Sequence, residues 1–64
     1  MESYYVNKER QDDGQHEVHK EWCIDVPPPE HQLLLGSFRD EQSALEEANF
    51  FFGKVTACTK CCGN

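Results

Sequence analysis

The 64-residue chain has no unbroken apolar run longer than three residues, as in 33-LLL-35 and 50-FFF-52. Runs of this length are too short for the hydrophobic part of a signal peptide or for a membrane-spanning helix. The sequence therefore predicts a cytoplasmic protein without a membrane segment, in a compartment that keeps cysteine thiols reduced.

Basic residues are also few: six Lys and Arg stand against twelve Asp and Glu, which gives a formal net charge of −6. Residues 1–32 hold eight acids and three bases, and residues 33–64 hold four acids and three bases. Binding to nucleic acid or to an anionic membrane needs clustered Lys and Arg, so we expect neither partner. The acidic surface suits solubility or a basic patch on a partner protein.

No catalytic motif is present. The glycines are scattered, so the chain offers no phosphate-binding loop. The segment 16-HEVH-19 combines two histidines and a glutamate, but the helical zinc-protease motif needs its histidines four positions apart on one helix. Here they are three apart in a segment with the pattern of a strand. We therefore expect the three histidines at the surface or at the rim of the fold: His16, His19 and His31.

Two segments near the N-terminus have the pattern of β-strands. Residues 3–7 are aromatic and β-branched, and residues 16–23 alternate between two faces. The polar stretch 8–15 joins them into a hairpin. Because Val18 and Trp22 are apolar, we expect their side of the second strand to face the core.

The rest of the chain predicts a third strand and a helix. Three prolines at 27–29 lack N–H donors and predict a rigid polyproline connection to a strand over residues 33–38. A helix is predicted over residues 41–52, with Asp40 as its N-cap and Gly53 as its stop. Its apolar stripe comprises Ala44, Leu45, Ala48, Phe51 and Phe52.

These elements predict an α+β fold, in which a three-stranded antiparallel sheet packs against one helix in the order β-β-β-α. Residues 55–57 are a candidate for a short fourth strand, and residues 58–64 are expected to form a mobile Cys-rich tail. Residues 1–64 suffice for a single small domain. A core of this size is marginally stable unless something cross-links the chain.

Four cysteines stand out, three of them in the segment 57-ACTKCCGN-64. Cys58 and Cys61 form a C-x-x-C pair, whose spacing lets one turn present two thiolates to a metal ion. Because no second C-x-x-C exists, we expect any zinc ion at Cys58, Cys61 and Cys62, with Cys23 as the fourth ligand.

His19 and Cys23 are the other candidate pair for such an ion. In a continuous strand their side chains share one face but lie about 13 Å apart along it. They can bind one ion only if the strand ends before Cys23.

Three other roles for the thiols remain open. A disulfide from Cys23 to one of the later cysteines would stabilise so small a chain, although a reducing compartment disfavours it. A redox pair needs a C-x-x-C at a helix N-terminus, and we expect no helix after Cys61. Cysteines also serve as small buried apolar side chains.

Spaced motifs cover nearly the whole chain: YYVN at 4–7, HEVHKEWC at 16–23, LGSF at 35–38, an Ala-containing helix at 44–48 and ACTKCC at 57–62. In these motifs the chain resembles a group of short bacterial proteins of uncharacterised function. The resemblance implies a compact β-β-β-α domain with no established activity. Members of that group often carry a further cysteine near the helix start, where this chain has 40-DEQ-42.

The function expected from the sequence is that of a small non-enzymatic domain that acts by contact with a protein partner. The alternative is an accessory domain stabilised by zinc at the cysteines, and the third is a thiol-dependent redox protein. The oligomeric state is left open by the sequence.

Overall fold

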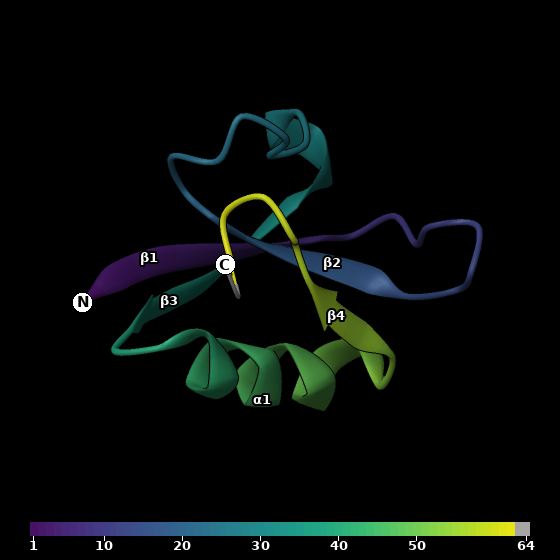
Figure 1. Ribbon diagram of the computed structural model, residues 1–64. Coiled ribbons are helices and arrows are strands. Elements are labelled where there is room, and N and C mark those ends of the chain that lie inside the picture. The colour runs from purple at the N-terminus through teal and green to yellow at the C-terminus, as the bar shows by residue number, and fades with distance from the viewer. Residues whose placement is uncertain (63–64) are drawn as a thin grey trace.

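The computed structural model describes residues 1–62, so Gly63 and Asn64, the end of the predicted mobile tail, lie outside the described part. Within it, a four-stranded sheet packs against one α-helix (Figure 1). The elements in chain order are β1 (Glu2–Asn7), β2 (His16–Lys20), the 3-10 helix η1 (Pro29–His31), β3 (Gln32–Phe38), α1 (Glu41–Phe52) and β4 (Val55–Ala57). The predicted α+β class is confirmed.

The sheet has the strand order β3-β1-β2-β4 and is mixed. β1 pairs antiparallel with β2, as the predicted hairpin requires, and antiparallel with β3 on its other side. β4 pairs parallel with β2. The predicted three-stranded antiparallel sheet was therefore wrong. The order β-β-β-α differs from the observed one by the strand after the helix, and the candidate strand at residues 55–57 is confirmed. The parallel pairing arises because α1 carries the chain across the sheet from β3 to β4, and a strand that follows such a crossover can enter parallel to its neighbour.

Helix α1 has the bounds and caps that the sequence predicts. Asp40 accepts a hydrogen bond from the Ser43 N–H at 2.9 Å, and Gly53 ends the helix at a φ of 77°, a left-handed conformation that glycine adopts without strain. Within residues 1–62, neither α1 nor any other helix is long and apolar enough to span a membrane.

The face of α1 that meets the sheet is centred on two alanines. Ala44 and Ala48 are fully buried, and their small side chains let the helix approach the strands closely. Phe51, which the sequence places on this face, is 52% exposed and contacts Phe50 edge-on instead, with 5.4 Å between the ring centroids. That assignment was wrong: Phe51 shares the helical stripe of Ala44 and Ala48, but in the last turn of α1 it is Phe52 that packs against the core.

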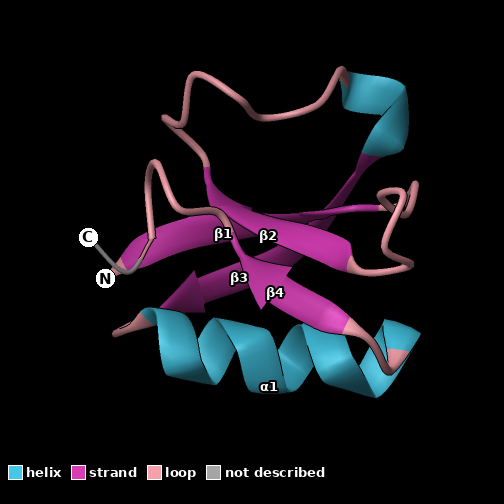
Figure 2. Cartoon of the chain, turned by 45° about the vertical axis from the view of Figure 1, so that its right-hand side comes forward, coloured by secondary structure: helices cyan, strands magenta, loops and turns pink. Residues whose placement is uncertain are grey.

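The remainder of the core comes from the central strands and from the cysteines. Tyr4, Val6 and Val18 are buried in β1 and β2, and the four cysteines join the same cluster. Figure 2 shows α1 on one side of the sheet and the connection between β2 and β3 on the other. Both faces of β2 are therefore covered where the chain passes Val18 and His19.

Trp22 does not face the core and is 61% exposed, so its predicted position was wrong. β2 ends at Lys20, and Trp22 lies in the turn that follows rather than in the strand. Its Nε1–H donates to Glu2 Oε1 at 2.7 Å, and the Lys20 ammonium lies 5.5 Å from its ring centroid. The indole thus packs along the surface.

Candidate metal centre

Because β2 and β4 are parallel, the C-terminal ends of these two strands lie side by side (Figure 1). Val18 is the register partner of Ala57, the last residue of β4. One residue later, the Cys58 N–H donates to Val18 O at 2.9 Å. Cys58 is therefore held beside His19, the next residue of β2.

A single turn of chain then presents two thiols to one side. The Cys62 N–H donates to Cys58 O at 2.9 Å, which closes a tight turn over residues 58–62. Within this turn Cys61 follows Cys58 at the C-x-x-C spacing, and the Lys20 N–H donates to Cys61 Sγ at 3.3 Å. The turn is thereby attached to the end of β2.

Cys23 reaches the same place because the chain turns as soon as β2 ends. The Cys23 N–H donates to Lys20 O at 3.0 Å, and the Val26 N–H donates to Cys23 O at 3.2 Å. These two turns reverse the direction of the strand, so the long separation of His19 and Cys23 expected for a continuous strand does not apply. The Asp25 N–H donates to Cys23 Sγ at 3.4 Å.

The result is a group of four buried donors: His19, Cys23, Cys58 and Cys61. The ligand atoms of these four side chains all lie within 4.8 Å of one another. Cys23 Sγ and Cys58 Sγ are 3.7 Å apart, and all four cysteines of the chain are free thiols. Zinc–sulfur bonds of about 2.3 Å in a tetrahedron place two sulfurs roughly 3.8 Å apart. The four-donor group can therefore hold a metal ion.

Three of the four ligands proposed from the sequence belong to this group, and His19 is the additional member. Cys62, the remaining proposed ligand, is buried next to the group with its Sγ 3.8 Å from Cys61 Sγ. Its Sγ also donates to Val18 O at 3.7 Å. The structure thus brings Cys62 beside the four donors without making it one of them.

His19 is only 1% exposed, which corrects the predicted surface position of this side chain. Neither ring nitrogen has a hydrogen-bond partner among the described residues. Nε2 lies 3.3 Å from Glu17 Oε1, a contact that lacks the geometry of a hydrogen bond. Burial lowers the pKa of His19, so the ring is neutral near pH 7, the form that binds metals.

The other two histidines have partners away from the group. His16 Nδ1 lies 2.8 Å from Asn7 O, and its ring stacks on Phe52 with 4.0 Å between centroids. His31 Nε2 lies 3.6 Å from Glu9 Oε2. These contacts account for both side chains as structural groups, in contrast to His19.

The thiols of the group are held in an environment that disfavours bare negative charge. Burial raises the pKa of Cys23 to about 12 and that of Cys61 to about 11, and it also raises the pKa of Cys62. Backbone N–H groups of Lys20 and Asp25 act in the opposite direction by donating to two of the sulfurs. A divalent cation would supply the charge compensation that these two hydrogen bonds provide only in part.

An ion pair on the surface links the two turns that carry the cysteines. Lys60 Nζ, from the turn between Cys58 and Cys61, lies 3.0 Å from Asp25 Oδ2, which follows Cys23. The two segments are far apart in sequence. The pair therefore connects the turn of Cys58 and Cys61 to the turn that follows Cys23.

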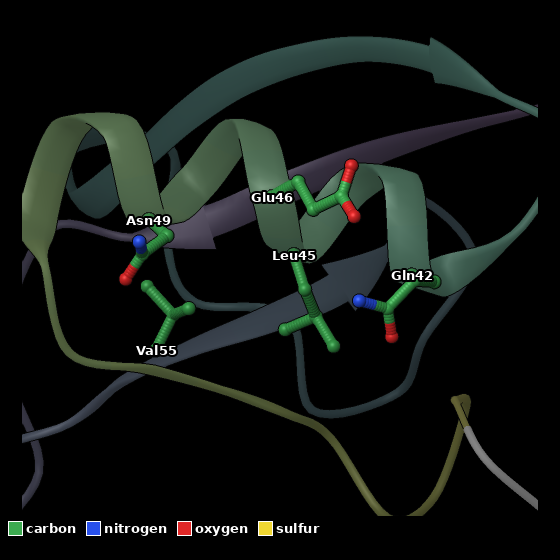
Figure 3. Close-up of a pocket in the computed structure, with 5 residues that line it drawn as sticks. All are labelled: Gln42, Leu45, Glu46, Asn49 and Val55. Atoms are coloured by element: carbon green, nitrogen blue, oxygen red, sulfur yellow. The ribbon is translucent and has the colours of Figure 1, made fainter.

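A separate cavity of about 250 Å³ lies between α1 and β4 (Figure 3). It is lined by Gln42, Leu45, Glu46, Asn49 and Val55. None of these residues belongs to the four-donor group, and the lining mixes amide, carboxylate and apolar side chains without a nucleophile. The chemistry of the described residues is therefore concentrated at the cysteines and His19.

Comparison of the chain with protein-family models, with curated proteins and with solved structures found no match.

Proposed function

We propose that this protein is a small non-enzymatic domain whose fold is stabilised by one structural zinc ion, bound by His19, Cys23, Cys58 and Cys61. The observation that carries the proposal is the state of His19. An imidazole that is 1% exposed, with neither nitrogen hydrogen-bonded to any residue in 1–62, is costly to bury. A metal ion shared with the neighbouring thiolates would satisfy it.

The donor set favours zinc over other common ions. Thiolate and imidazole ligands suit Zn²⁺, whereas Ca²⁺ and Mg²⁺ prefer oxygen ligands. Three cysteines and one histidine make a recognised structural zinc set, in which protein atoms fill all four positions of a tetrahedron. A closed set leaves no place for a reactive water, which is why we propose a structural role and not a catalytic one.

In a chain this short, a zinc ion would stabilise a small core that is rich in cysteine. Nine buried apolar residues form the core in the described part of the chain, and four of them are cysteines. A bound ion would therefore cross-link a large part of the core, in a chain too short for a large hydrophobic interior. Metal binding and folding are coupled in small domains of this kind. The protein partner expected from the sequence remains a prediction, as does a cytoplasmic location.

Zinc content and stability test the proposal together. Purified protein should contain one zinc ion per chain by elemental analysis, and removal of the ion by a chelator should lower its melting temperature. A chain that binds no zinc at micromolar concentrations and melts identically with and without chelator would overturn the proposal.

Two thiol variants distinguish the ligands. Cys58→Ser removes a member of the four-donor group, and we expect zinc affinity to fall by more than about 100-fold. Cys62→Ser is the matched control, because Cys62 is equally buried and adjacent but outside the group. Its affinity should stay within about threefold of the wild type. An equal loss in both variants would favour the all-cysteine set instead.

A further inference from the structure

A carboxylate lies against the buried imidazole of the proposed zinc site. Glu17 and His19 are two positions apart in β2, so their side chains project from the same face of the sheet. Glu17 Oε1 lies 3.3 Å from His19 Nε2. This contact identifies which edge of the imidazole faces the carboxylate.

A neutral imidazole has one nitrogen that binds a metal and one N–H that donates a hydrogen bond. The two nitrogens of His19 therefore have different tasks when the ring is a ligand. Glu17 Oε1 lies within hydrogen-bond distance of Nε2, yet its carboxylate is not a member of the four-donor group. Nε2 is thus directed to Glu17, which leaves Nδ1 for the ion.

We propose that Glu17 is a positioning residue, which accepts the Nε2–H of His19 and thereby makes Nδ1 the metal ligand. This inference depends on the zinc site proposed above. The 3.3 Å between Glu17 Oε1 and His19 Nε2 is within the distance of a hydrogen bond, and the proposal requires the two side chains to align into one when the ion binds. Carboxylate groups commonly hold metal-binding histidines in this way, fixing the tautomer and making the ligand more basic.

The backbone around Glu17 is fixed by strand pairing, which helps to hold its carboxylate against His19. Glu17 pairs with Thr56 of β4 in the parallel register, and its neighbour Val18 pairs with Val6 of β1. The strand is therefore bonded on both sides at this point. The Glu17 side chain remains partly accessible, at 29%, so its second oxygen can stay hydrated while the first accepts from the ring.

The binding nitrogen can be identified directly in the wild-type protein. Protein labelled with ¹⁵N and loaded with ¹¹³Cd²⁺, a spectroscopic substitute for zinc, should show cadmium coupling to His19 Nδ1 and a protonated Nε2. Cadmium coupling to Nε2 would overturn the positioning role while leaving the zinc site intact. Absence of cadmium binding to the chain would instead refute the site itself, and the inference with it.

Affinity measurements test the role of the carboxylate. Glu17→Ala should weaken zinc binding by about 10- to 100-fold, and Glu17→Gln should recover most of that loss because the amide oxygen still accepts from Nε2–H. Glu21→Ala, which removes an exposed carboxylate just beyond the end of β2, is the control and should bind as the wild type does. An unchanged or tighter affinity in Glu17→Ala would show that the carboxylate does not support His19.

Discussion

Cys23 Sγ and Cys58 Sγ lie 3.7 Å apart, although these residues are 35 positions apart in the chain. This distance is close to the roughly 3.8 Å edge between two sulfurs on one zinc ion and far above the approximately 2.05 Å of a disulfide bond. Two backbone turns and one strand pairing establish the distance. The same proximity makes the thiols vulnerable to oxidation when no metal holds them.

Metal-free protein should therefore form a Cys23–Cys58 disulfide under mild oxidation with diamide, and zinc should suppress it. The ion would occupy both thiolates and keep the sulfurs at their tetrahedral separation. Peptide mapping by mass spectrometry after alkylation identifies the pair. Equal disulfide yields with and without zinc would contradict this prediction, and Cys58→Ser provides the blank.

Zinc binding near pH 7 should release about three protons per ion. The raised pKa values of Cys23 and Cys61 mean that these thiols are protonated in the metal-free fold and must lose their protons to become ligands. Affinity should consequently increase with pH from about 6 to 8. Titration calorimetry in buffers of different ionisation enthalpy counts the protons. Release of fewer than about two protons would be inconsistent with three cysteine ligands.

Asp40→Ala should destabilise the protein at neutral pH by removing the cap of α1. The Ser43 N–H donates to the carboxylate and holds the Asp40 pKa below its ordinary value of 3.8. A lowered pKa contributes stability above the unfolded-state pKa, and that contribution is lost as the pH falls through the folded-state value. Urea unfolding should thus show a higher free energy of unfolding for the wild type than for the variant at pH 7. This difference in free energy should become smaller at pH 3 or below. A difference that does not change with pH would argue against the charged cap.

Val18→Ala and Trp22→Ala should differ sharply, although the sequence places both residues on one face. Val18 is fully buried in β2, so its truncation should lower the free energy of unfolding by about 1–3 kcal/mol. Trp22 lies at the surface, and we expect a loss below about 1 kcal/mol from its truncation. Denaturant unfolding of the two variants with zinc present makes the comparison. A larger loss for Trp22→Ala would contradict the observed packing.

Most local elements were predictable because their signals are local. The Asp40 cap, the Gly53 stop and the alternation in residues 16–20 each act over a few positions, and the structure reproduces the strands and the helix at these places. The pairing of residues 55–57 was not predictable in the same way. Whether a three-residue strand joins parallel to β2 or elsewhere depends on the path of the helix before it, and no residue within the strand encodes that path.

The metal centre was predictable in part for a related reason. The C-x-x-C spacing of Cys58 and Cys61 indicates a shared turn by itself, and Cys23 is the one cysteine outside the segment 57–64. The role of His19 depends on where β2 ends. The alternating pattern continues to Cys23 and gives no sign that the hydrogen-bonded strand ends at Lys20. The sequence therefore predicts a long distance between His19 and Cys23, which the turn after Lys20 removes.

The parallel pairing of β2 with β4 also affects the order in which parts of the protein fold. His16 and Val55 are register partners roughly forty positions apart, whereas β1 and β2 are joined by the short segment 8–15. Closing a long stretch of chain costs more entropy than closing a short one, so we expect the hairpin to form early and β4 to attach late. With zinc at the proposed centre, the last step of folding would be the one that captures the ion. The supply of zinc in the cell would then set the fraction of newly made chains that reach the complete fold.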